Sequence, residues 1–303
     1  MDRLEAMSVL LTAVDKGSLS AAARELQQPV STVTRRVTEL EEVLGTRLLT
    51  RTTRKLTLTD AGAAYVASAR RILDLVREQE HEATGEFMTP RGELVITTPV
   101  QFGRLHVIPI INGFLAKFPE ISIKLLQSDR NVDLVEHRVD LAIRIGALAD
   151  SSMVATRVGA LRPILCASPA FLKQHGRPRD PDDLGRFPCV VFASPYLSPW
   201  RFRMPGTGKA IALPVDARLQ VSAPDAAVDS AVAGIGITLV LEHDVDAMLQ
   251  AGKVEPLLED YEADPVPVHI LHVSRNMMPV KLRQFIDFAA PRLRASLAHM
   301  GKR

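Results

Sequence analysis

The segment SLSAAARELQQPVSTVTRRVTELEEVL, residues 18–44, decides the fold of the N-terminal part of the chain. Two short helical patterns are separated by a tight turn at residues 26–28, and these are the proportions of a helix-turn-helix. Pro29 suits the first turn of the second helix, and Gly45 suits its end. The segment therefore predicts two packed helices, and the outward face of the second indicates what the pair can bind.

The second helix has one apolar side and one small, polar and basic side. At 100° per residue, the side predicted to be buried holds Val33, Val37, Leu40 and Leu44. The outward side near the helix start holds Ser31, Arg35 and Thr38, with Thr34 flanking them. Short hydroxyl side chains allow close approach to base edges, and Arg35 can donate two hydrogen bonds to guanine. Arg36 points sideways, nearer a phosphate than a base. This helix is therefore predicted to read the major groove of double-stranded DNA.

Basic charge is concentrated beside this helix. The 303 residues carry a net charge of only +2, which taken alone argues against a protein coated in positive charge for nucleic acid. Residues 47–55, however, hold Arg47, Arg51, Arg54 and Lys55 and no acid. Phosphate contacts by Lys and Arg supply most non-specific DNA affinity. Helix and charge together favour DNA binding over the alternative, a solvated face on an ordinary three-helix module.

Composition excludes several other classes of protein. Hydrophobic residues make up 47% and charged residues 24%, which is ordinary for a globular protein. No run approaches the roughly 18 apolar residues of a membrane span, so no membrane partner is expected. The N-terminus is mixed in charge and does not look like a signal peptide. Two cysteines, Cys166 and Cys189, suit a reducing compartment. The expected location is the cytoplasm.

Helical and strand patterns continue on both sides of the helix pair. A preceding helix is predicted from an apolar stripe at three- and four-residue spacing, Leu4, Met7, Leu11 and Val14. Residues 46–58 predict a small two-stranded element joined by a polar turn. Residues 60 to about 84 predict a helix of ~20 residues, roughly 30 Å long.

The long helix carries a second apolar stripe, formed by Tyr65, Ile72 and Val76. Such a stripe is compatible with pairing against the same helix of a second chain. The alternative is that the helix packs on its own domain. Both remain open from the sequence.

The chain changes character at residues 90–92, beyond which short β-branched runs alternate with helical patterns. Strands are predicted at residues 94–97, 121–125, 141–143 and 163–166. Helices are predicted at residues 105–118 and 132–137. Alternation of this kind is typical of parallel sheets covered by helices, and about 210 residues suffice for two lobes.

Long stretches of the chain resemble LysR-type transcriptional regulators. Four stretches resemble the N-terminal domain of that family, namely residues 18–26, 33–37, 40–54 and 56–62. Four further stretches resemble the effector-binding domain of the family, namely residues 140–146, 166–172, 233–237 and 280–287. The resemblance therefore runs across the whole chain.

The resemblance implies an α+β multidomain fold. It implies a winged helix-turn-helix over residues 1–59, a linker helix and hinge over 60–89, and an effector domain over 90–303. That domain would have two α/β lobes, Rossmann-like and similar to periplasmic binding proteins, with lobe I at about 91–161 and 267–303 and lobe II at about 162–266. The implied function is a non-enzymatic regulator, a homodimer or homotetramer, whose binding to promoter DNA is modulated by a small effector.

The residues expected to contact DNA lie on the helix pair and the basic hairpin. They are Ser20, Val30, Ser31, Thr32, Thr34, Arg35, Arg36, Thr38, Arg51, Thr53, Arg54 and Lys55. Val30 departs from the family pattern, because many members carry glutamine at this base-reading position. An apolar contact with a thymine methyl group fits the valine.

An effector is expected in the cleft between the lobes, outside the carboxyl ends of strands. The residues expected to line it are Thr98, Pro99, Val100, Gln101, Phe102, Gln127, Ser128, Arg144, Ser222 and Ala223. Two helix starts with free N–H groups, together with Arg144, would favour a small carboxylate. Ordinary loop and capping roles are the alternative for each of these residues.

Other chemical signals are weak. Gly234-Ile235-Gly236 lacks the remainder of a nucleotide-binding motif. His269 and His272 would point to opposite faces of a strand, so no metal site is expected. Cys166 is predicted to be a core residue, and Trp200 a packing residue. We expect no cofactor. An enzyme would need a catalytic cluster that is not visible, and an exported solute-binding protein would need a signal peptide.

Overall fold

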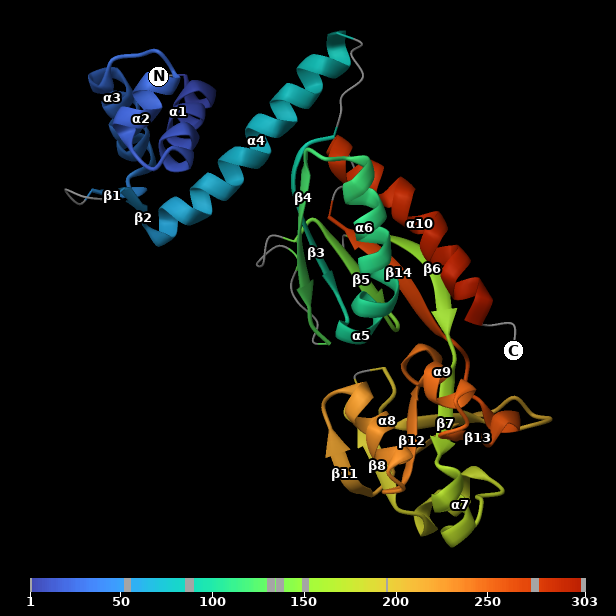
Figure 1. The fold of residues 1–303 in the computed structure, drawn as a ribbon. Helices are drawn as coiled ribbons and strands as arrows, with labels where there is room; N and C mark the ends of the chain where they lie inside the picture. Colours follow the sequence, from blue (N-terminus) through green and yellow to red (C-terminus); the bar gives the residue numbers. More distant parts are fainter. Residues whose placement is uncertain are drawn as a thin grey trace. The chain divides into compact units, whose positions relative to one another are not determined.

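The structure is a computed structural model that describes residues 2–51, 56–84, 90–129, 134, 139–148, 153–194, 196–273 and 278–300. The chain divides into two compact units, Met1–Met88 and Thr89–Arg303, and each is described by itself (Figure 1).

The first unit contains three short helices, a two-stranded hairpin and one long helix (Figure 1). In chain order its elements are α1 (Arg3–Asp15), α2 (Leu19–Glu25), α3 (Val30–Leu44), β1 (Leu49–Arg51), β2 (Leu56–Leu58) and α4 (Asp60–Thr84). The hairpin is antiparallel, with Leu49 opposite Leu58. The predicted helix pair and the predicted span of the long helix are confirmed.

Local side chains and backbone conformations set the helix ends. Asp2 caps α1 by accepting a hydrogen bond from the Leu4 N–H at 2.9 Å. Ser18 caps α2 by accepting from the N–H of Ala21 at 3.1 Å. At the end of α3, Gly45 adopts a left-handed conformation with φ of 65°, which a residue without a Cβ reaches at little cost.

One hydrophobic core holds the first unit together. Its buried side chains are Ala6, Val9, Leu10, Leu11, Ala13, Ala22, Ala23, Val33, Val37, Leu40, Leu48, Leu49, Val66 and Ala69. Two predicted core positions were wrong, because Leu4 is 40% exposed and Leu44 is 39% exposed. α1 contacts α2, α3 and α4, so its buried surface is wider than the single stripe predicted for it. Leu44 is the last residue of α3, where the chain turns away toward the hairpin.

The long helix α4 packs on the core of its own unit through residues between Tyr65 and Leu73. Val66 and Ala69 are buried in the core, and Leu73 packs against it. Ile72 is 42% exposed. The start of α4 therefore packs on its own domain, which was one of the two alternatives. Ile72 is a surface residue of this unit.

The second unit contains two five-stranded sheets, and the first of them with its helices forms lobe I. The sheet has the order β4-β3-β5-β14-β6. Its strands are β3 (Gly92–Thr98), β4 (Ile121–Gln127), β5 (Leu141–Ile145), β6 (Val154–Leu161) and β14 (Val266–His272). Its helices are α5 (Val100–Phe102), the π-helix η1 (Gly103–Val107), α6 (Ile108–Lys117) and α10 (Val280–Met300). The helices α6 and α10 lie side by side over the sheet (Figure 1).

Lobe II is built on the second sheet, which has the order β11-β8-β12-β7-β13. Its strands are β7 (Pro163–Ala167), β8 (Cys189–Phe192), β11 (Ala217–Val221), β12 (Ile237–Leu241) and β13 (Glu255–Leu257). A separate hairpin pairs β9 (Trp200–Arg203) with β10 (Ala210–Leu213). The helices of this lobe are α7 (Pro169–His175), η2 (Pro181–Arg186), α8 (Pro224–Val232), α9 (Glu242–Gln250) and η3 (Glu259–Tyr261).

Both sheets are mixed, so the expectation of purely parallel sheets was wrong. β3 runs parallel to β4 and β5, whereas β14 runs antiparallel to both β5 and β6. In lobe I the reason is the path of the chain, which leaves after β6 and returns from lobe II through β14. In lobe II, β7 runs antiparallel to β12 and β13, whereas β8 runs parallel to β11 and β12. The predicted helix at residues 105–118 corresponds to η1 and α6, which continue from α5. The predicted helix at residues 132–137 lies outside the described residues, apart from Leu134 in a turn.

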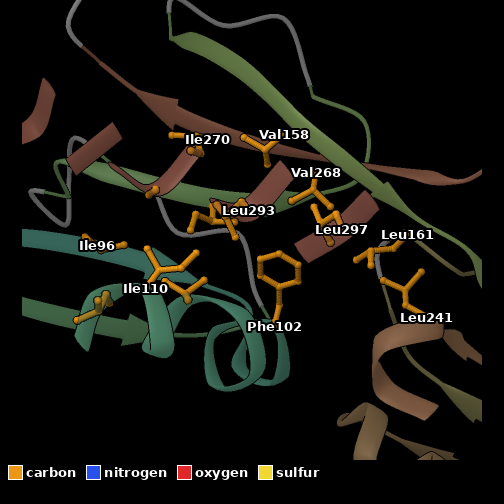
Figure 2. Close-up of a cluster of buried hydrophobic side chains, with 14 of the residues drawn as sticks. Ile96, Phe102, Ile110, Val158, Leu161, Leu241, Val268, Ile270, Leu293 and Leu297 are labelled. Carbon is orange, nitrogen blue, oxygen red and sulfur yellow. The ribbon is translucent and has the colours of Figure 1, made fainter. Parts of the chain in front are cut away.

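A continuous hydrophobic cluster joins the two lobes. Figure 2 shows Phe102 among side chains of lobe I, with Leu161 and Leu241 toward lobe II. Arg162, which directly follows β6, also ties the crossover segments together, because its Nη2 lies 2.7 Å from Oε1 of Glu262. No helix within the described ranges is long and apolar enough to cross a membrane.

Candidate nucleic-acid interface and ligand cavity

The N-terminal half of α3 presents a side that is free of acids. Val30 is 45% exposed, Ser31 is exposed, and the Arg35 side chain is 69% exposed. Thr32, Thr34 and Thr38 are half-buried. Glu39 lies one turn further on, 3.7 Å from the Arg35 guanidinium, a distance that leaves the arginine able to move to another partner. This side of α3 can therefore enter a major groove with hydroxyl, methyl and guanidinium groups foremost.

Two other residues expected to contact DNA have defined positions. Ser20 is exposed on α2. Arg36 forms an ion pair with Glu5 of α1, and its Nη1 lies 3.4 Å from Oε1 of Gln28. Arg36 therefore joins α3 to α1 and would have to give up the ion pair to reach a phosphate.

The hairpin β1–β2 follows α3 and forms the wing. Arg51 is the last residue of β1, where its backbone pairs with Leu56. The predicted contacts Thr53, Arg54 and Lys55 lie outside the described residues, as does the side chain of Arg51. Arg47, which precedes β1, is exposed. The basic side chain described next to α3 is therefore that of Arg47, just before the wing.

A cavity of about 580 Å³ lies in the second unit, with walls from both lobes and from the returning crossover. It is lined by Pro99, Ser128, Asp129, Leu134, Arg144, Ile145, Gly146, Ala147, Leu148, Met153, Tyr196, Arg201, Asp264, Pro265, Val266, Pro267 and Leu271. Of the predicted effector residues, this brings together Pro99, Ser128 and Arg144. Its volume suits a small organic molecule.

The other predicted effector residues do not line this cavity. Phe102 is fully buried in the core, and Thr98 is fully buried at the end of β3, so neither side chain can touch a ligand here. Val100 and Gln127 contact each other instead, through a 3.0 Å hydrogen bond from the Gln127 amide to the Val100 carbonyl. The remaining three, Gln101, Ser222 and Ala223, are at least partly exposed elsewhere.

Both helix starts expected to hold an anion already carry a carboxylate. The N–H of Val100 donates to Oδ1 of Asp129 at 3.1 Å. At the start of α8, the N–H of Ala226 donates to Oδ1 of Asp225 at 2.9 Å. At each of these starts one N–H is therefore bonded to an aspartate, Asp129 after β4 or Asp225 in α8 itself, which supplies negative charge there.

The positive charges of the cavity come from arginines instead. Arg144 is only 8% exposed, and burial lowers the pKa of its guanidinium. Arg201 lies across the cavity on β9 of lobe II. Of the two acids in the lining, Asp264 forms an ion pair with Arg203, and Asp129 caps the Val100 N–H. The cavity therefore offers guanidinium groups from both lobes beside apolar walls.

Aromatic rings of the two lobes meet at the helix that starts beside Pro99. The ring of Phe102 packs edge-on against His243 of α9, with centroids 5.6 Å apart. The ring centroid of His106 lies 5.7 Å from that of His243. Nδ1 of His106 lies 3.0 Å from the hydroxyl oxygen of Ser296. Burial lowers the pKa of His106 to about 4 and that of His243 to about 3. The helix that begins at the cavity is therefore in direct contact with lobe II.

Most lining residues were not predicted from the sequence, among them the polar residues Asp129, Tyr196 and Arg201. Asp129 directly follows the predicted Ser128, and the signal for it was a carboxyl group two residues beyond the end of β4. Tyr196 and Arg201 come from an irregular segment of lobe II and the following hairpin, for which no pattern in the sequence indicated a cavity.

The weaker signals in the sequence have structural explanations. A Cβ on Gly236 would lie 2.5 Å from the carbonyl oxygen of Pro188, so close packing requires this glycine. Cys166 is fully buried, as predicted, and burial raises the pKa of its thiol to about 12. Trp200 is buried in the core of lobe II, as predicted. Among the described residues, no group of three or more potential metal ligands is present.

A winged helix-turn-helix joined to a two-lobed domain with a cavity defines a DNA-binding regulator that responds to a ligand. Two family models match the chain. "Bacterial regulatory helix-turn-helix protein, lysR family" covers residues 4–63, and "LysR substrate binding domain" covers residues 89–294. The chain belongs to the LysR family of transcriptional regulators, and its C-terminal unit is an effector-binding domain.

Similar proteins match over almost the whole length. An HTH-type transcriptional repressor of Pseudomonas aeruginosa is 33% identical, over 95% of this chain and 91% of its own. The HTH-type transcriptional activator AaeR of Escherichia coli is 32% identical, over 95% and 93%. Relatives at this level of identity thus include both a repressor and an activator.

Solved structures agree with the fold. Full-length AphB, a virulence activator of Vibrio cholerae, has a TM-score of 0.61 at 30% identity, covering 95% of this chain and 98% of its own. CrgA of Neisseria meningitidis has a TM-score of 0.60 at 31% identity, with the same coverage.

Proposed function

We propose that the protein binds operator DNA as a homodimer or homotetramer in the cytoplasm. The acid-free side of α3 would enter the major groove, and the basic wing would contact the flanking phosphates. The observation that carries this part is the exposure of Val30, Ser31 and Arg35 together at the start of α3. The exposed Ile72 on α4 supports pairing between two chains.

The effector in this proposal is a small anion with an apolar body, bound in the 580 Å³ cavity. Arg144 and Arg201 would hold the anionic group from opposite lobes, since a guanidinium binds a carboxylate with two parallel hydrogen bonds. Leu148, Met153 and Leu271 would contact the apolar part. The presence of arginines from both lobes is the observation that carries this step.

Effector binding would alter how the lobes pack. The ligand would lie beside Pro99, at the start of the helix that carries Phe102 and His106. Those two rings contact His243 of lobe II, so a shift of this helix start changes the packing between lobes. A ligand that prefers one packing shifts the population toward it, and thereby changes operator affinity.

Genome-wide recovery of bound DNA tests the first part and supplies the operator. Binding is expected to weaken steeply with salt, and Arg35→Ala is expected to cost about 1–3 kcal/mol with relaxed base preference. Arg186→Ala, on the surface of lobe II, is the control and should leave binding unchanged. Unchanged affinity and base preference in Arg35→Ala would show that the reading face is assigned wrongly.

Calorimetry with pairs of carboxylates and their neutral amides tests the effector class. Carboxylates are expected to bind at least tenfold more tightly than the amides, and Arg144→Met should remove that preference. Asp129→Asn should strengthen carboxylate binding, because it removes a negative charge from the cavity while the amide oxygen can still accept from Val100. Equal affinity for carboxylates and amides would contradict an anionic effector.

A further inference from the structure

We propose that Glu41 is a positioning residue that sets the distance between the recognition helix α3 and the wing. Its Oε1 accepts hydrogen bonds from the backbone N–H groups of Leu48 at 2.7 Å and Leu49 at 2.9 Å. These bonds run from the last turns of α3 to the start of β1. The inference rests on the proposed function in one respect, namely that the wing contacts DNA.

The same short segment is fixed on its carbonyl side to the start of α4. The carbonyl oxygen of Leu48 accepts from the N–H of Thr59 at 3.0 Å. The Thr59 hydroxyl donates to the Arg47 carbonyl at 2.7 Å and accepts from the N–H of Gly62 at 2.9 Å. A Cβ on Gly62 would lie 1.9 Å from the Leu48 oxygen, so α4 touches this backbone directly. Recognition helix, wing and long helix therefore meet at Leu48.

Leu48 and Leu49 pack in the same core as α3, but the contact between α3 and the wing is open beside them. A hollow of about 600 Å³ lies between the C-terminal half of α3 and the start of β1, and Glu41 and Thr50 are among the residues that line it. The carboxylate of Glu41 reaches from α3 to β1 beside this hollow. Without it, the N–H groups of the buried Leu48 and Leu49 would lose their acceptor, and the start of the wing could move.

The position of the wing decides how many phosphates its basic residues reach while α3 lies in the groove. A negative charge near DNA costs affinity through repulsion of phosphates. Glu41 and the exposed Glu42 are adjacent and line the same hollow, so each contributes this cost. Within the described part of the chain, the carboxylate of Glu42 makes no hydrogen bond or ion pair, in contrast to that of Glu41. Substitution of Glu42 therefore provides a matched control for the removal of charge.

The experiment compares full-length Glu41→Ala, Glu41→Gln and Glu42→Ala on the recovered operator. Affinity is measured between 50 and 200 mM salt, and hydroxyl-radical footprints report wing and groove protection separately. In Glu41→Ala we expect the wing footprint to disappear while the groove footprint persists. The salt slope should fall by about 0.9 for each phosphate that the wing no longer reaches. Affinity should fall about 3- to 10-fold if one or two phosphates are released in this way.

The isosteric and neighbouring variants separate positioning from charge. Glu41→Gln keeps an oxygen acceptor for both N–H groups, so its wing footprint should match that of the wild type. Glu42→Ala removes the same charge and should bind slightly more tightly with both footprints intact. If Glu41→Ala does not fold, Glu41→Asp replaces it, because the carboxylate is then one methylene too short to hold both bonds.

Two results would overturn the proposal. A wing footprint and salt slope in Glu41→Ala equal to those of Glu42→Ala would show that the wing does not depend on Glu41. Uniform disappearance of the wing and groove footprints in both Glu41→Ala and Glu41→Asp would mean that the residue only stabilises the domain. A wild-type protein without any wing footprint would instead refute the proposed interface itself.

Discussion

Val30 is an apolar side chain where DNA-contacting helices commonly place polar groups. It is 45% exposed at the first position of α3 and lies beside small hydroxyl residues. The C5-methyl of thymine is the apolar group available in a major groove, and burying one methyl group contributes about 0.8 kcal/mol. We therefore infer that Val30 favours a thymine in each half-site.

Replacing single thymines of the operator by uracil tests this preference. One dT→dU change per half-site should weaken wild-type binding about fourfold, the equivalent of ~0.8 kcal/mol. The same dT→dU change should leave the operator affinity of Val30→Ala unchanged. Val43→Ala, which removes an exposed valine near the other end of α3, is the control and should respond as the wild type does. A uracil penalty that persists in Val30→Ala would contradict the contact.

Gly146 allows the lobes to approach closely at the cavity. Its φ is 110°, a region that residues with a Cβ rarely adopt, and a Cβ there would lie 3.3 Å from Cβ of Tyr196 in lobe II. Gly146→Ala should lower the free energy of unfolding by about 1–3 kcal/mol, measured by urea denaturation. Gly185→Ala has open space around it and should change it by less than about 0.5 kcal/mol. Equal stabilities of the two variants would contradict strain at Gly146.

Residue patterns predicted the buried and exposed sides of α3 better than the cavity. The side of α3 follows from helical period alone, because Val33, Val37 and Leu40 are buried and fix its rotation. The cavity depends on which loops meet in space. The capping of Val100 by Asp129 joins residues 29 positions apart, and no local pattern reports such a contact.

Among the elements, α4 has one half packed on its own unit and an apolar residue left at its surface. Ile72→Asp should weaken self-association at least tenfold, because it would bury an unpaired charge between two helices. Sedimentation at several protein concentrations measures this. Arg71→Asp adds an acid about 100° away on the helix and should leave association unchanged. Unaltered association in Ile72→Asp would place the interface elsewhere.

The elements themselves were predictable where their signal is local. The 25 residues of α4 follow from an uninterrupted helical pattern. The mixed direction of the lobe I sheet was not predictable, because it depends on β14 entering between β5 and β6 after the whole of lobe II. Strand direction is a property of the chain path, and a run of apolar residues carries no information about it.

At the scale of the whole molecule, buried histidines between the lobes link stability to pH. Burial lowers the pKa of His106 to about 4, from about 6.5 in an unfolded chain. Between these values the unfolded state binds the extra proton, so the free energy of unfolding falls as pH falls from 6.5 to 4. The slope from this group is up to about 1.4 kcal/mol per pH unit.

Urea denaturation between pH 4.5 and 7 measures this linkage. His106→Asn keeps a polar partner for Ser296. It should reduce the slope of the free energy of unfolding against pH by the equivalent of about one bound proton. His243 acts in the same direction, whereas burial raises the pKa of Asp244 to about 8 and opposes it. The difference between variant and wild type isolates His106. An unchanged slope would mean that the pKa of His106 is the same in the folded and the unfolded chain.

The position of β14 has a consequence for protein synthesis. Lobe II uses a continuous stretch of chain from Pro163 to Leu257, so all its sheet strands emerge from the ribosome together. In the lobe I sheet, β6 pairs only with β14 among the described strands, and β14 comes more than a hundred residues after β6 begins. The second lobe can therefore fold during translation while the first waits. A chain arrested before β14 should resist protease over lobe II and be cut in β6.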